Sequence, residues 1–153
     1  MGRIEDKLKE MGFTLPNYRR ATYPFNQTNR VGNLVFVAGQ VASDANGVVA
    51  GKLGKDIDVE EGAKRAKLCI LNALTALKGE LGDLDKIKRI VRTFVMVNGT
   101  EEFNFPSGVA NGASELLVSL FGEYGYATRC AVVMQNLPSD TSVEIEMFVE
   151  VED

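Results

Sequence analysis

Charged side chains near the carboxyl end of the chain could act together on a small anion. Arg129 begins an apolar stretch that predicts a strand, and a turn containing Leu137 and Pro138 follows it. The next predicted strand carries Glu144 and Glu146 at alternate positions, which places both carboxylates on one face. A planar guanidinium group can bind a carboxylate through two parallel hydrogen bonds, and a nearby glutamate can transfer a proton. The alternative to such a site is that Arg129 lies at a solvated strand end and the two glutamates lie on a solvent-exposed sheet face, which is the commoner setting for these residue types.

The composition limits which chemistry is available. The chain of 153 residues contains no histidine, which excludes a Ser-His or Cys-His nucleophile pair and removes the commonest zinc ligand. Its two cysteines, Cys69 and Cys130, are too few and too far apart for a zinc knuckle or a disulfide framework. Both are expected to be small buried residues. Acid–base chemistry must therefore come from carboxylates, tyrosine, lysine or cysteine.

The charge pattern argues against nucleic-acid and membrane partners. Net charge is −4, from 21 acidic and 17 basic residues, so the chain lacks the positive field that attracts phosphates. The nearest basic patch has Lys86, Lys88, Ile90 and Arg92 on one face of a predicted strand, and we expect that face to be solvated. No apolar run approaches the roughly 20 residues of a membrane helix. The charged amino-terminal segment does not resemble a secretory signal, so a cytoplasmic protein is expected.

The order of the predicted elements indicates an α+β fold. A strand over residues 34–39 and a hairpin turn over 43–47 come first. A long helix, a strand over 87–97, a second helix ending near Gly122 and two strands on either side of 137–140 follow. This order favours both helices on one face of a mixed sheet. The other face then needs a cover, and we expect oligomerisation through the sheet to supply it.

Local signals mark both helices. Asp58 is the expected N-cap of the long helix, with Glu61 three residues later, and Gly79 or Gly82 ends it. In the second helix Gly112 costs about 1 kcal/mol relative to alanine, and we expect it to permit a close approach of subunits.

No repeat or linker divides the chain, so a single domain over residues 1–153 is expected. Residues 1–15 are expected to form a helical extension with an amphipathic helix over 4–11. Its role, in assembly or in partner binding, stays open.

Several motifs together resemble the Rid/YjgF family, the reactive intermediate (enamine/imine) deaminases. The resemblance covers nearly the whole chain after about Pro16 and is closest to a divergent branch. The matching stretches are GNLVFVAGQ (32–40), GDLD (82–85), the strand that ends in Val97-Asn98, and TRCAVVMQNLPSDTSVEIE (128–146).

This resemblance implies a chorismate-mutase-like fold and a homotrimer whose sheets form a central barrel. It implies three ligand sites in clefts between subunits, and no metal or organic cofactor. The implied activity is hydrolysis of enamines and imines such as aminoacrylate, released by pyridoxal-phosphate enzymes, to a 2-keto acid and ammonia.

The resemblance also assigns roles to residues. Arg129 would bind the substrate carboxylate, and Glu144 would orient water and relay protons, with Glu146 as a rival for that role. Tyr18 would close the cleft, while Gly39 and Gln40 would form its wall and hold polar atoms of the substrate.

Two positions depart from the family pattern and keep other functions open. Many active members have serine where this chain has Ala38, and cysteine where it has Ala131. By strand alternation, Cys130 should face away from Arg129. The alternatives are a regulatory trimer that binds a small anion without turnover, and an RNA-directed activity such as ribonuclease or inhibition of translation.

Overall fold

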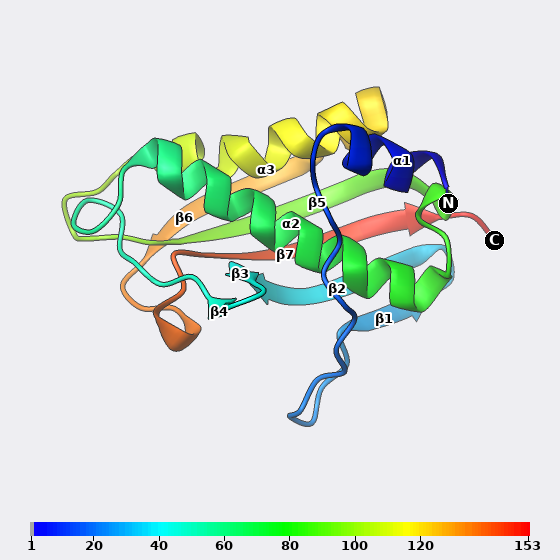
Figure 1. Ribbon diagram of the computed structural model, residues 1–153, viewed down its shortest axis with the longest axis horizontal. Coiled ribbons are helices and arrows are strands. Elements are labelled where there is room, and N and C mark those ends of the chain that lie inside the picture. Colours follow the sequence, from blue (N-terminus) through cyan, green and yellow to red (C-terminus); the bar gives the residue numbers. More distant parts are fainter. Residues whose placement is uncertain (1) are drawn as a thin grey trace.

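Five strands form one mixed sheet, and the two long helices cover one of its faces in the computed structural model, which describes residues 2–153 (Figure 1). The strands of this sheet are β1 (Thr28–Val31), β2 (Leu34–Val41), β5 (Ile87–Asn98), β6 (Thr128–Met134) and β7 (Val143–Val151). A small pair of strands, β3 (Ser43–Asp44) and β4 (Gly47–Val48), forms the predicted hairpin. The α-helices are α1 (Arg3–Glu10), α2 (Val59–Leu81) and α3 (Pro106–Phe121). Short 3-10 turns are η1 (Leu84–Lys86), η2 (Gly122–Gly125) and η3 (Pro138–Asp140). The predicted α+β class, with both long helices on one side, is confirmed.

The strand order is β1-β2-β7-β5-β6, so the two closing strands are not neighbours. β7 lies between β2 and β5 and is antiparallel to both, whereas β6 pairs with β5 in parallel. β6 is therefore an edge strand of the sheet, and Arg129 lies on that edge. β1 forms the opposite edge.

The long helix α2 begins and ends as its sequence predicts. The Asp58 carboxylate accepts a hydrogen bond from the backbone N–H of Glu61 at 2.9 Å, which satisfies one of the first unpaired N–H groups of the helix. Gly82 is the C-cap, with a φ of 77° that favours glycine. Within residues 2–153, no helix combines the length and the apolar character needed to cross a membrane.

Gly112 brings α2 and α3 together within one chain, rather than two subunits. A Cβ atom at this position would collide with the backbone carbonyl of Ala63 in α2. The expectation of a close subunit approach at Gly112 is therefore wrong, because α2 itself occupies the space. A glycine inside a helix suggests a close approach, but the local sequence does not say which partner approaches.

The amino-terminal helix docks on its own chain. Ile4 and Leu8 are buried in the main core. The Asp85 carboxylate, distant in sequence, accepts hydrogen bonds from the backbone N–H groups of Arg3 at 2.8 Å and Ile4 at 2.9 Å. These bonds cap α1 from outside, since Gly2 offers no side chain for the task. The chain after α1 then crosses α2 as an extended segment, residues 13–27, which we call the strap (Figure 1).

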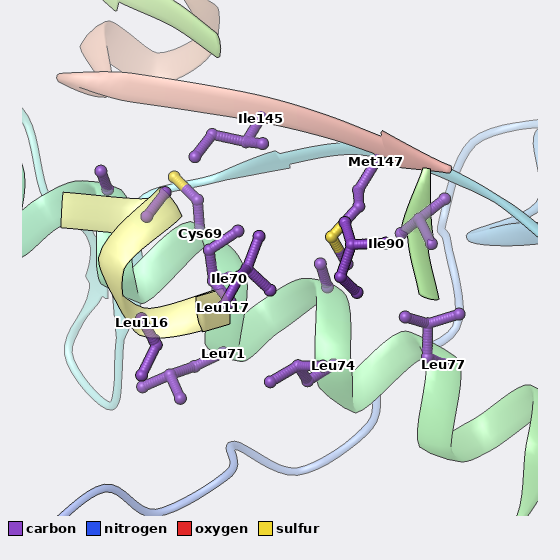
Figure 2. Packing of buried hydrophobic residues seen from close by; sticks show 14 of the residues in the cluster. Cys69, Ile70, Leu71, Leu74, Leu77, Ile90, Leu116, Leu117, Ile145 and Met147 are labelled. Carbon is purple, nitrogen blue, oxygen red and sulfur yellow. The ribbon is translucent and has the colours of Figure 1, made fainter. Parts of the chain in front are cut away.

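The core lies between the two long helices and one face of the sheet (Figure 2). Leu74 and Leu77 of α2 and Ile145 and Met147 of β7 are fully buried there. Cys69 is fully buried, as predicted, and its thiol donates to the backbone carbonyl of Val143. The expectation for Cys130 is wrong, because it is only half-buried on the sheet face without helices.

The second face of the sheet, which we call the open face, carries no helix. The rings of Phe36 and Phe148 meet edge to face there, with centroids 4.8 Å apart. The guanidinium of Arg92 lies over the ring of Phe94 at 5.5 Å and over that of Phe148 at 5.7 Å. These half-buried aromatic and charged side chains leave an incompletely covered surface.

The basic segment at the start of β5 differs from its expected alternation. Ile87 and Ile90, three residues apart, are both buried, so Ile90 does not share a solvated face with the basic residues. Register shifts between Ile87 and Arg89 and between Ile90 and Arg92 are the cause, because each inserts a residue into the strand. Nζ of Lys88 lies 3.6 Å from Oε1 of Glu150.

Candidate active site

Arg129 is held in place by the helix that crosses its strand. It lies opposite Thr93 in the parallel pairing of β6 with β5, and Thr93 faces the helices. Its Nη1 donates to Oδ1 of Asn111 at 2.8 Å and to Oγ of Ser114 at 3.2 Å, both in α3. Arg129 is thus neither a free solvated strand end nor part of an ion pair with a carboxylate among residues 2–153. Its charge stays available to a ligand.

Asn111 and Ser114 are site residues that the sequence analysis did not assign. They are three residues apart in α3 and therefore lie on one face of that helix. Glu115 and Val118 continue the same face, and with Arg129 they line a hollow of about 480 Å³ between α3 and the start of β6, the β6 hollow. The signal in the sequence that could have identified them is the spacing of two small polar residues three positions apart in a predicted helix.

Glu144 lies on the open face, half-buried, opposite Val41 in β2 and Met96 in β5. A Cβ atom added to Gly39 would lie 3.1 Å from the Glu144 carboxyl carbon, so the glycine makes room for this carboxylate. Burial, and then the nearby Glu146 carboxylate, raise the pKa of Glu144 above its ordinary value. A glutamate with a raised pKa is better suited to exchange a proton near neutral pH.

Tyr18 and Gln40 line a second, larger hollow of about 850 Å³, the strap hollow. It lies between the strap, α2 and the β3–β4 hairpin. Tyr18 is 52% exposed, and its ring rests against α2 at Gly79, where a Cβ atom would approach it to 2.9 Å. Nε2 of Gln40 donates to Oε1 of Gln27 at 2.8 Å, which ties the strap to β2.

The predicted site residues form two groups in a single chain. Gly39 and Glu144 are in contact, and Gln40 lies beside them near the strap hollow. Arg129 is on the far edge strand, about 10 Å from β7 and about 14 Å from β2, since neighbouring strands lie about 4.8 Å apart. Arg129 faces the helices while Glu144 faces the open side. One copy of the chain therefore does not bring Arg129 and Glu144 onto one ligand.

Within residues 2–153, no cluster of three or more His, Cys, Asp or Glu side chains could hold a metal ion. The groups available for chemistry are the carboxylates of Glu144 and Glu146, Arg129 and the polar residues around it.

Comparison with known proteins places this arrangement in a family. A family model described as "YjgF/chorismate mutase-like, putative endoribonuclease" matches residues 5–151. The chain belongs to this family. Protein TCP17 of Trypanosoma cruzi is 37% identical over 151 residues, 97% of this chain and 94% of that protein. The crystal structure of Atu1372 from Agrobacterium tumefaciens is 39% identical with a TM-score of 0.91, covering 98% of this chain and 94% of that one.

A more distant solved structure shares the fold and contains a small ligand. TdcF of E. coli with bound serine is 21% identical, with a TM-score of 0.60 over 88% of this chain and 92% of that one. At this identity the similarity shows the fold alone.

The two departures from the YjgF pattern lie on the strands that carry the site. Cys130 pairs with Phe94 and Arg129 with Thr93, so the thiol faces the open side, away from Arg129, as predicted. Ala131 occupies the position on the Arg129 side. Ala38 lies in β2, where its carbonyl accepts a hydrogen bond from Gln40 at 3.1 Å.

Proposed function

We propose that this YjgF-family protein hydrolyses enamine and imine intermediates of the 2-aminoacrylate type to a 2-keto acid and ammonia. The observation that carries the proposal is the anchored Arg129. All hydrogen bonds of its guanidinium to residues 2–153 come from Nη1, and their acceptors are neutral. Nε and Nη2 are left for a ligand, and their geometry suits a carboxylate bound by two parallel hydrogen bonds.

The chemistry requires positioning and a few proton transfers. Protonation of the enamine at carbon gives the imine, water adds to the imine carbon, and the resulting carbinolamine expels ammonia and forms the keto group. Arg129 would fix the carboxylate, and Glu144 would take a proton from the attacking water and return it to the leaving nitrogen. The raised pKa of Glu144 supports this exchange.

We propose that each complete site forms between two copies of the chain in a homotrimer. One copy would supply Arg129 from its β6 edge, and the other would supply Glu144, Gly39, Gln40 and Tyr18. The distance between β6 and β2 within one chain, and the uncovered open face, support this assembly.

A coupled assay tests the activity. A serine or threonine dehydratase generates the imine in the presence of semicarbazide, and capture is compared with and without the protein. Wild type should suppress capture and Arg129→Ala should not. Arg89 is an exposed arginine of β5 whose guanidinium lies over the ring of Tyr124. Arg89→Ala is the matched control and should retain activity.

Stability separates a ligand-binding role of Arg129 from a structural one. Since Arg129 is exposed and makes two hydrogen bonds at the surface, Arg129→Ala should leave the oligomer and the Tm nearly unchanged. A large loss of stability would show that the arginine is structural, and full activity of the variant would contradict the proposal.

The position of Cys130 favours a second candidate, a trimer that binds a small anion without turnover. No thiol lies on the Arg129 side of β6 to bind the attacking water, because Ala131 occupies that position. Binding of a 2-keto acid that depends on Arg129, together with no suppression of capture, would identify this function. An RNA-directed activity is less well supported, since Lys88 lies near Glu150 and Arg92 stacks on two phenylalanines.

A further inference from the structure

The β6 hollow has one basic side chain, one acidic side chain and an apolar wall. Arg129 is its only basic residue among those described, and Glu115, its only acidic one, is exposed on α3. An anionic group entering the hollow is attracted by the guanidinium and repelled by the Glu115 carboxylate, so Arg129 is where it can bind. The side chains of Leu117, Val118 and Ala127 form much of the remaining lining.

The apolar wall has surface to offer to a ligand. Val118 and Ala127 are only half-buried, so part of their surface meets water in the free chain. The ring of Tyr126, 74% exposed, stands at the same hollow and adds an aromatic side. Removing such surface from water stabilises a complex in proportion to the apolar area covered.

In a single chain, the hollow is larger than a three-carbon substrate can fill. Its volume of about 480 Å³ lies within the range of about 300–1,000 Å³ for ligand pockets. A carboxylate held by Arg129 with a single methyl or methylene group attached would leave most of the apolar wall in contact with water. A branched or aromatic side chain would cover it.

We infer that the β6 hollow selects 2-imino acids with a branched or aromatic side chain, whose carboxylate lies on Arg129 and whose side chain lies against Val118, Ala127 and Tyr126. This inference rests on the proposed function for its reaction, and it adds the substrate class. The matching products are branched or aromatic 2-keto acids, so the enzymes that supply the substrate would act on branched or aromatic amino acids.

Two measurements test the inference, and one does not depend on turnover. The first is calorimetric binding of pyruvate, 4-methyl-2-oxopentanoate and phenylpyruvate. The second is suppression of semicarbazide capture for imines made from alanine, leucine and phenylalanine by a flavin amino-acid oxidase with catalase. The larger keto acids should bind at least about tenfold tighter than pyruvate, and the larger imines should be hydrolysed with a similar advantage in kcat/KM.

Variants locate the preference in the hollow. Ala127→Leu fills the hollow, so the affinities for large and small keto acids should become nearly equal. Tyr126→Ala removes an exposed ring, which cannot disturb the core, and should weaken the preference for phenylpyruvate. Ala50→Leu, the same change at an exposed position outside both hollows, is the matched control and should keep the difference in affinity between large and small keto acids.

The possible results separate the two proposals. Tighter binding of the larger keto acids without hydrolysis of any imine would overturn the deaminase activity and support the hollow as a selective site. Equal or better binding and hydrolysis of the three-carbon compounds would overturn the inference and leave the deaminase proposal standing. A size preference that survives both Ala127→Leu and Tyr126→Ala would also overturn it, because another surface would then be responsible.

Discussion

Arg129 is fixed by neutral partners, which is how a protein can orient a cation without cancelling its charge. The side chains of Asn111 and Ser114 accept hydrogen bonds from Nη1 of the guanidinium and carry no charge themselves. A carboxylate in the same place would form an ion pair and compete with an anionic ligand. The residue types around the guanidinium therefore matter as much as the arginine itself.

The first prediction replaces one neutral partner with a charged isostere. Asn111→Asp would place a carboxylate at the 2.8 Å contact with Nη1. We expect binding of 2-keto acids to weaken by about tenfold or more, while the Tm changes little because the contact is exposed. Calorimetry of wild type, Asn111→Asp and Asn111→Ala measures this. The alanine variant has no added charge and should lose less affinity, so equal losses in the two variants would contradict the prediction.

The second prediction concerns the pKa of Glu144. Burial and the neighbouring Glu146 raise this pKa above its ordinary value of 4.5. The folded protein then binds this proton more tightly than the unfolded chain, so ionisation of Glu144 lowers stability as the pH rises from 4.5 through the raised value. Glu144→Gln removes that loss. The variant should have the higher Tm at neutral pH, and the difference should shrink as the pH falls and disappear below 4.5.

Thermal unfolding across this pH range provides the measurement. Glu150→Gln, on the same face of β7, is the control and should not reproduce the pH-dependent gain. A gain from Glu144→Gln that is the same at all pH values would show that ionisation is not its cause.

At the scale of elements, the crossing of α2 and α3 sets where Asn111 and Ser114 lie above β6. The third prediction is that Gly112→Ala disrupts this crossing. The added methyl group would run into the Ala63 backbone, which cannot rotate away as a side chain can. We expect the free energy of unfolding to fall by about 1–3 kcal/mol, despite alanine's better helix propensity.

Gly108→Ala is the matched control within the same helix. Its methyl group would meet side-chain atoms of Phe105 and Val59, which can turn further aside than the Ala63 backbone can. Denaturant unfolding should show a clearly smaller loss for this variant than for Gly112→Ala. Similar losses in both variants would mean that the backbone contact at Gly112 is not the deciding feature.

Local signals in the sequence predicted the elements well, whereas long-range pairing was beyond them. The Asp58 cap and the end of α2 at Gly82 depend on residues close in the chain, and both predictions are confirmed. The placement of β7 between β2 and β5, and the bulges near Ile90, depend on which distant strand pairs with which. The bonds from Arg129 to Asn111 and Ser114 went unassigned for the same reason, since they follow from how α3 crosses β6.

At the scale of the whole molecule, the proposed trimer would join two different surfaces of the chain. The β6 edge carries the anchored guanidinium, and the region around β2 and β7 carries the carboxylate with the raised pKa. Apolar side chains near the opposite edge are exposed, among them Val31 at 66% and Leu34 at 40%. A second copy that covers this surface would also supply the missing half of the site, so burial of the open face and completion of the site would be one event.

The last prediction tests whether Arg129 and Glu144 act from different subunits. Arg129→Ala and Glu144→Gln should each be inactive alone as homotrimers. After mixing at equal amounts and reassembly from mild denaturant, about a quarter of the sites should combine the intact arginine of one chain with the intact glutamate of another, because the subunits of a cyclic trimer are interchangeable. Semicarbazide capture should then be suppressed to a corresponding fraction of the wild-type level. A chain carrying both substitutions, mixed with wild type, is the control, since it can create no new complete site. If the two single variants stay inactive after proven subunit exchange, both residues act from the same chain, and the site between copies is excluded.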